Sequence, residues 1–240
     1  MSVRYLNNNL IKIDKTEVLR YLRYKNKNID ENTNKLLDES IAELMEISEL
    51  KYVFRIFSLK KENNNISFEA HINIKSNDLE KLFKNCKKSA VMAATIGFEV
   101  ERKLRYYSMA DLSKAVVFDA CAAACIEALC DEAESEIKKI AENEGYNTTF
   151  RYSPGYGDVP ISHQGEILIA LNAQKLIGLT VSDSSILIPR KSVTAFIGFD
   201  ESDEIHKSSC LNCSLFGNCV FSKEAVAKDI IDQIVKSYVE

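Results

Sequence analysis

Apolar residues recur at helical spacing in two stretches near the start of the chain. The segment Asp14–Tyr24 opens with Asp14 and Glu17, whose three-residue separation is typical of a helix cap. Apolar residues then follow at Val18, Leu19, Tyr21 and Leu22. Beyond the polar residues 25–34 they return at spacings of three and four, at Leu36, Leu37, Ile41, Leu44 and Met45. Two amphipathic helices joined by a loop are predicted.

Strand patterns follow these helices. Residues Lys51–Leu59 and Ile66–Ile74 flank a polar segment, and in the second of them every other residue is apolar, as in a strand with one buried face. A β-hairpin is therefore predicted. The segment Ala90–Ile96 is apolar throughout and is followed by Gly97. This predicts a strand covered on both faces that turns into a helix.

The second half of the chain predicts one long helix, a shorter helix and a last strand. The long helix runs from about Met109 to about Asn143, and Ser162–Leu176 has the pattern of the shorter one. The last strand is indicated by alternating apolar residues at Val193, Ala195, Ile197 and Phe199. We expect a single mixed α+β domain over residues 1–240, with a helical and hairpin part at about 1–85 and a cysteine-containing segment at about 203–240.

Composition narrows the classes of protein. At 46% hydrophobic and 28% charged residues the chain is ordinary for a globular protein, so disorder is not expected. Lys and Arg total 31 against 35 for Asp and Glu, which argues against nucleic acid as a partner. The most apolar stretch, Ala115–Cys130, contains Asp119 and Glu127 and is too short to span a bilayer. With no apolar run behind a basic start, we expect a cytoplasmic protein with reduced thiols and no membrane contact.

The loop Arg151–His163, with the sequence RYSPGYGDVPISH, carries the clearest chemistry. Two glycines bracket Tyr156 and prolines lie on either side, which favours a fixed, non-helical backbone. Arg151 offers a planar set of donors that suits a carboxylate, so a small anionic or zwitterionic ligand fits the pattern. The same residues also fit a tight turn, with Arg151 as a surface cation and the tyrosines at the edge of the core.

This loop belongs to a set of ordered segments that resembles a known family. The segments are IDKTEVLRYLRY, AVMAATIGFEVER, FDACAAACIEALCDE, RYSPGYGDVP and LTVSDSSILIPRKSVTAFIGF, and together they cover most of the chain. They resemble the activation domain of cobalamin-dependent methionine synthase and its stand-alone relatives. The resemblance implies a bent antiparallel sheet flanked by helices, with S-adenosylmethionine held in a shallow groove.

Carried over to this sequence, the resemblance implies a set of binding residues. Arg151 would pair with the methionine carboxylate, and Glu127 and Asp14 would receive the ammonium or lie beside the sulfonium. The adenosine would be lined by Ser153, Pro154, Gly155 and Tyr156. Asp119 is expected at the rim, exposed. Where the family has an aromatic polar residue in the last strand, this chain has apolar residues at 195–197.

The resemblance also implies partners. No Asp-x-His-x-x-Gly motif for cobalamin is present in the sequence, so cobalamin would be supplied by a methionine synthase or a related corrinoid protein. A flavodoxin or ferredoxin would give the electron, and S-adenosylmethionine the methyl group, in reactivating the inactive cofactor. Methyltransferase activity would then require the partner. The alternatives are a non-catalytic binding or regulatory module for a corrinoid protein and a metal-binding accessory protein.

The metal hypothesis concerns three cysteines near the C-terminus. Cys210 and Cys213 have the two-residue gap that lets both thiolates reach one metal, and Cys219 would be a third ligand. Zinc or an iron–sulfur cluster would need a fourth, from His206 or Cys86. Reduced thiols on a surface loop fit the spacing equally well. Three other cysteines, in the long helix, are expected to pack in the core: Cys121, Cys125 and Cys130.

Overall fold

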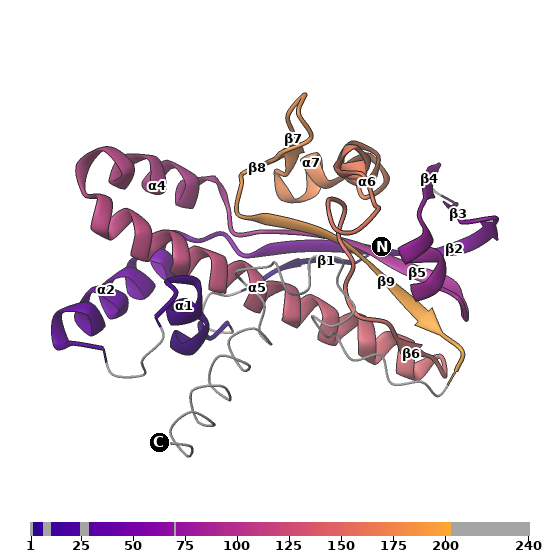
Figure 1. Ribbon diagram of the computed structural model, residues 1–240, viewed down its shortest axis with the longest axis horizontal. Helices are drawn as coiled ribbons and strands as arrows, with labels where there is room; N and C mark the ends of the chain where they lie inside the picture. Colours follow the sequence, from indigo (N-terminus) through magenta and orange to yellow (C-terminus); the bar gives the residue numbers. More distant parts are fainter. Residues whose placement is uncertain (1, 7–10, 25–28, 70, 203–240) are drawn as a thin grey trace, which may run out of the picture.

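The computed structural model describes residues 2–6, 11–24, 29–69 and 71–202. Within them, seven strands form one antiparallel sheet in the order β4-β3-β2-β5-β9-β6, with β1 paired to β2 (Figure 1). The strands are β1 Ser2–Tyr5, β2 Lys51–Glu62, β3 Asn65–Phe68, β4 Ile72–Lys75, β5 Cys86–Thr95, β6 Asn147–Thr148 and β9 Ser192–Asp200. A separate two-stranded ribbon consists of β7 Thr180–Val181 and β8 Leu187–Ile188.

Helices cover both faces of the sheet. On one face the long helix α5 runs along the strands, and α1, α2 and α4 pack around it (Figure 1). The shorter helices α3, α6 and α7 lie on the other face. The first group is α1 Lys15–Tyr21, α2 Glu31–Ile47, α4 Phe98–Ala110 and α5 Leu112–Asn143. The second is α3 Asn77–Leu82, α6 Gln164–Ala170 and α7 Ala173–Ile177. In the part of the chain that the structure describes, every helix is too short or too polar to cross a membrane.

The two central strands explain the unbroken apolar runs in the sequence. In β5, Met92 points into the core beneath α5 and Val91 into the core on the opposite face. In β9, Ile197 and Phe196 divide in the same way. Because side chains of a strand alternate between faces, a strand covered on both sides needs apolar residues at every position. The predicted covered strand is thus confirmed.

The turn from β5 into α4 depends on a glycine. Gly97 has φ +94°, a conformation that residues with a side chain rarely adopt. A Cβ atom there would lie 2.9 Å from the Cβ of Glu49, so the backbone approach also needs the missing side chain. The strand–turn–helix transition predicted at this residue is confirmed.

Among the element boundaries that differ from the prediction, three have a local cause in the structure. The segment Ile66–Ile74 is two strands, β3 and β4, which pair with Phe68 opposite Ile72. The apolar residues of both strands are buried, so the alternation in the sequence hides the break between them. Residues 162–176 are interrupted at Asn172, whose φ of +51° ends α6 and separates it from α7. Lastly, α2 begins within the predicted loop, because the Asp30 side chain caps it at Thr33 N–H.

Candidate functional site

The loop after β6 is tied to the sheet through its main chain. Tyr152 and Phe196 of β9 exchange two backbone hydrogen bonds of 3.0 and 2.9 Å. Farther along, the N–H of Gly155, at φ +93°, donates to the carbonyl of Val159 over 2.8 Å. Pro154 and Val159 are buried. The glycine- and proline-rich segment is therefore a fixed bend, as its sequence predicts.

Asp158 anchors the far side of this bend to α3. Its carboxylate accepts hydrogen bonds from the hydroxyl of Ser76 and, over 2.7 Å, from the N–H of Asn77. Burial alone would raise the pKa of Asp158, but these hydrogen bonds lower it below its ordinary value. The carboxylate is therefore held in its charged form at the start of α3.

Gly157 lies next to a second contact between the loop and α3. The hydroxyl of Tyr152 donates to the carboxylate of Asp78 over 2.9 Å. A Cβ atom on Gly157, which has φ +51°, would lie 2.1 Å from both of the bonded oxygen atoms. Glycine at this position is needed both for the turn and for the contact between the loop and α3.

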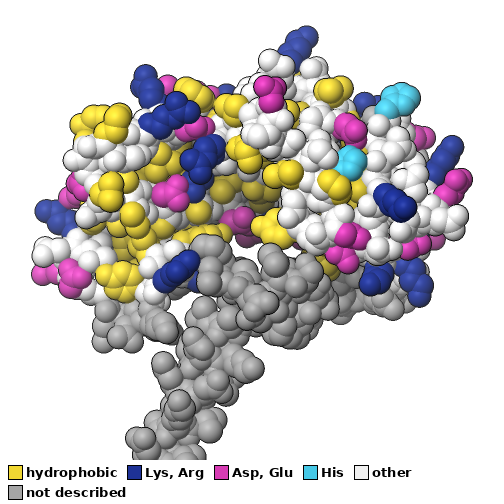
Figure 2. Space-filling view, turned by 45° about the horizontal axis from the view of Figure 1, so that its top comes forward, with side chains coloured by type: hydrophobic (Ala, Val, Ile, Leu, Met, Phe, Trp, Pro, Cys, Tyr) yellow, Lys and Arg dark blue, Asp and Glu magenta, His cyan; other side chains and the backbone are white. Residues whose placement is uncertain are grey.

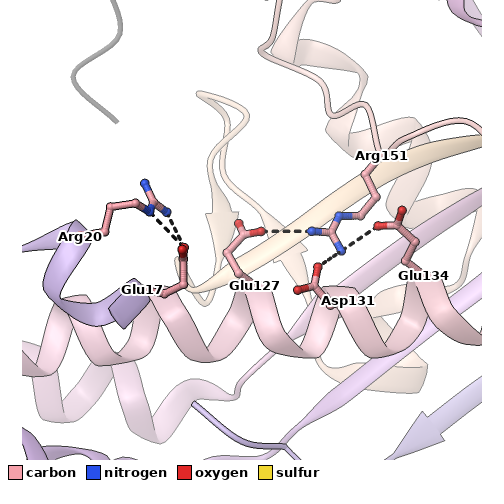
Figure 3. A network of polar contacts seen from close by, with 6 residues as sticks. All are labelled: Glu17, Arg20, Glu127, Asp131, Glu134 and Arg151. Atoms are coloured by element: carbon pink, nitrogen blue, oxygen red, sulfur yellow. Dashed lines mark hydrogen bonds and ion pairs between the residues drawn. The ribbon is translucent and has the colours of Figure 1, made fainter. Parts of the chain in front are cut away.

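Arg151 joins the start of the loop to α5 (Figure 3). Its Nη2 atom lies 3.2 Å from Oε2 of Glu127. Its Nη1 atom lies 2.8 Å from Oδ1 of Asp131 and 3.1 Å from Oε2 of Glu134. The three acids follow one another at spacings of four and three, so they share one face of the helix. The structure therefore brings Arg151 and Glu127 into direct contact.

Burial and charge set the protonation of this cluster, which we call the Arg151 cluster (Arg151, Glu127, Asp131 and Glu134). The Arg151 side chain is only 19% exposed. Burial would lower the pKa of its guanidinium, but Cys130 beneath it and the three carboxylates raise that pKa above its usual value. Burial raises the pKa of Glu134. Nη1 is buried and, although two carboxylates are within ion-pair distance, it makes no hydrogen bond of good geometry.

An apolar hollow of about 770 Å³ opens one helical turn away, between α4 and α5 (Figure 2). Its wall includes Tyr21 of α1 and Ala123 of α5, which lies four residues before Glu127. Burial raises the pKa of the Tyr21 hydroxyl, and the charge of Glu127 raises it further. One turn before Ala123, Asp119 forms an ion pair of 2.9 Å with Lys191, and both residues line the hollow. The Arg151 cluster therefore lies beside a hollow whose lining combines apolar and charged side chains.

The remaining predicted binding residues are placed in different ways. Tyr156 is 58% exposed at the tip of the loop. The side chain of Asp14 caps α1 by accepting a hydrogen bond of 2.8 Å from Thr16 N–H, and hydrogen bonds from Thr16 lower its pKa. Among the described residues, no hydrogen bond or ion pair joins Asp14 to Arg151 or Glu127. The Asp14 side chain is thus used as the cap of α1, and its place in a ligand site stays a prediction.

Two acids of the cluster were not singled out from the sequence. Asp131 and Glu134 lie on the same face of α5 as Asp119, Ala123 and Glu127. Their spacing of three and four residues is the feature of the sequence that could have identified them. The spacing does not indicate where the loop that carries Arg151 crosses the helix. Only the packing of the loop over α5 shows that one arginine meets three acids.

The cysteines of the described residues form no metal site. All four are buried, and the three in α5 pack in the core as predicted. In the described part of the chain, no group of three or more His, Cys, Asp or Glu side chains is arranged to hold a metal ion. The predicted ligands Cys210, Cys213 and Cys219, with His206, lie outside the described residues.

Comparison with known proteins identifies the fold. No model of a protein family matches the sequence, and no curated protein matches it. Among solved structures, the chain is similar to the crystal structure of the MetH reactivation domain bound to AdoHcy, with a TM-score of 0.66 and 15% identity. The likeness covers 87% of this chain and 81% of that one. The predicted α+β fold, an antiparallel sheet flanked by helices, is confirmed.

Proposed function

We propose that this chain, which shares its fold with the MetH reactivation domain, binds S-adenosylmethionine at the Arg151 cluster and the adjoining loop. The observation that carries the proposal is the contact between Arg151 and Glu127, two residues far apart in the sequence. The solved structure of similar fold is bound to AdoHcy, the demethylated form of the same ligand. The first support concerns the junction of the loop with α5, and the second concerns the fold as a whole.

The chemistry of the ligand suits this junction. S-adenosylmethionine carries a carboxylate, an ammonium and a sulfonium, so it needs both a cation and acids around it. In the proposed mode, Arg151 faces the carboxylate, and Glu127 lies near the positive groups, with Asp14 as a second acid at the start of α1. The adenosine would lie against the loop at Ser153, Pro154, Gly155 and Tyr156. To pair with the ligand, the guanidinium must exchange at least one of its present partners.

The proposed role in a cell is reactivation of a corrinoid methyltransferase. Cobalamin on a partner protein supplies the methyl acceptor, and a flavodoxin or ferredoxin supplies the electron. The work of this chain is to hold the sulfonium methyl toward the partner, with the ligand fixed by charge and by the rigid bend. Because positioning carries this role, no side chain needs to act as a nucleophile.

Isothermal titration calorimetry with S-adenosylmethionine tests the binding. We expect Arg151→Ala to weaken binding by about 1.5–3 kcal/mol, because a charge-assisted pair is lost. Lys87→Ala is the control: its side chain is exposed on β5 and pairs with Glu201 at 2.9 Å. The proposal fails if the wild-type protein binds no ligand at millimolar concentration. Thermal unfolding of each variant separates lost binding from lost folding.

The second candidate is a binding module that recognises a corrinoid protein without methyl transfer. The open apolar hollow beside the site supports a role in docking as well as in ligand binding. The two functions are distinguished by incubating the protein with a corrinoid methyltransferase, a reductant and methyl-labelled S-adenosylmethionine. Label transferred to the partner supports reactivation, and partner binding without transfer supports the module.

A further inference from the structure

Negative charge is in excess at the Arg151 cluster. Three carboxylates face one guanidinium, so two negative charges remain when all four groups are ionised. Asp131 is 72% exposed and its charge reaches the open surface beside the loop. The next cation along α5, Lys138, pairs with Glu142. A ligand therefore meets a surface whose net charge attracts cations and repels anions.

This excess bears differently on the two forms of the ligand. S-adenosylmethionine has a net charge of plus one, because its sulfonium adds to a balanced ammonium and carboxylate. When the methyl group is transferred, the sulfur–carbon bond breaks, its electron pair stays on sulfur, and the product is a neutral thioether with no net charge. The two molecules otherwise present the same groups.

We propose that Asp131 and Glu134 make the site selective for the sulfonium ligand over its thioether product. One of the three carboxylates is enough to balance the charge of Arg151, so the cluster keeps two negative charges in excess. Asp131 and Glu134, on the same helix face, then attract the positive charge of the sulfonium, which is lost when the methyl group is transferred. The product is released more readily than the substrate because the site loses its electrostatic attraction at the moment of transfer. This inference rests on the proposed function.

The size of the effect follows from Coulomb's law. A unit charge about 8 Å away, in surroundings between those of a protein surface and bulk water, changes affinity for a cation by about threefold. Removing one of the two acids should therefore lower the preference for S-adenosylmethionine over S-adenosylhomocysteine by about threefold. Because Asp131 is exposed, the effect should shrink as salt rises above about 0.15 M, where the screening length is about 8 Å.

The test compares dissociation constants for both ligands in the wild-type protein, Asp131→Asn, Glu134→Gln and the double variant. These changes keep side-chain shape and remove only the charge. Glu99→Gln is the control, because Glu99 is a partly exposed acid of α4 that pairs with Arg102 on the same helix. We expect the ratio of the two constants to fall about threefold in each single variant, further in the double variant, and not in the control.

A third ligand separates charge from contacts specific to sulfur. Sinefungin replaces the methylated sulfonium with an aminated carbon and keeps the positive charge. We expect its affinity to change with the variants as that of S-adenosylmethionine does. If both natural ligands bind and their ratio is the same in every variant, the selectivity inference is wrong while the proposed function stands. If neither binds the wild-type protein, the proposed function is wrong and the inference falls with it.

Discussion

Replacing Gly157 by alanine should break one of the two anchors that hold the loop against α3, the hydrogen bond between Tyr152 and Asp78. The added Cβ would lie 2.1 Å from Oη of Tyr152 and from Oδ2 of Asp78, far closer than any stable contact. These two atoms form the 2.9 Å hydrogen bond that holds the loop against α3. Relief of the clash must separate them, since Gly157 cannot move without shifting the neighbouring Asp158, which is bound to α3 as well.

The expected loss of stability has three contributions. A side chain at positive φ costs about 1–2 kcal/mol. Loss of a partly buried hydrogen bond to a charged acceptor costs about 1–2 kcal/mol. The reduced freedom of alanine in the unfolded chain offsets about 0.4–1 kcal/mol. Gly157→Ala should therefore lower the free energy of unfolding by about 1–3.5 kcal/mol.

Gly178→Ala is the control, because Gly178 has φ +72° and no atom lies within 4 Å of the place that an added Cβ would take. The control carries the backbone cost without the clash, so the two variants should differ by about 1–2 kcal/mol. Urea unfolding followed by circular dichroism measures both. If the variants are equally stable, the clash does not break the hydrogen bond. Full additivity of Gly157→Ala with Tyr152→Phe would refute the reasoning in the same way.

Two further predictions concern titration and thiol chemistry. Burial would raise the pKa of Glu43, but hydrogen bonds from Lys103, Tyr107 and Lys114 lower it to about 2. Because the folded pKa is depressed, this stabilisation is present above the ordinary value of 4.5 and is lost as pH falls toward 2. Glu43→Gln should therefore reduce the change in the free energy of unfolding between pH 2 and 6 by about 1–2 kcal/mol, after allowance for solvent screening. Urea unfolding across this pH range measures the change, and a variant with the same pH profile as the wild-type protein contradicts the prediction. Burial raises the pKa of four thiols, those of Cys86, Cys121, Cys125 and Cys130. When the native protein is alkylated at pH 8, peptide mapping should therefore find these four cysteines unmodified. Alkylation of any of them before unfolding would count against their burial.

Much of the fold follows from periodicity, and the misassigned segments show where periodicity fails. The long helix and the covered strands were predictable because each has one consistent pattern over many residues. The break between β3 and β4 was not, because the strand alternation continues unchanged through a tight turn. The interruption at Asn172 depends on one residue in a left-handed conformation, which no apolar pattern records.

The candidate site was predictable only in part. The rigid bend follows from its glycines and prolines, and the juxtaposition of Arg151 with Glu127 was expected from the resemblance and is present in the structure. Asp14 shows the limit of such reasoning, since its sequence context predicts both a helix cap and a ligand contact, and the structure places its side chain in the cap. The number of acids that meet Arg151 depends on how the loop crosses α5, which is a matter of tertiary packing.

The Arg151 cluster has a consequence for how the long helix can change in evolution. Its acids lie at positions 127, 131 and 134, and each residue of an α-helix advances the side-chain direction by about 100°. Substitutions along α5 leave that alignment intact. A single inserted or deleted residue between the helix start and Glu127 would instead turn the acids away from Arg151, or turn the core residues of the same helix out of the sheet. We expect relatives with a similar site to vary in residue type along this segment but to keep its length.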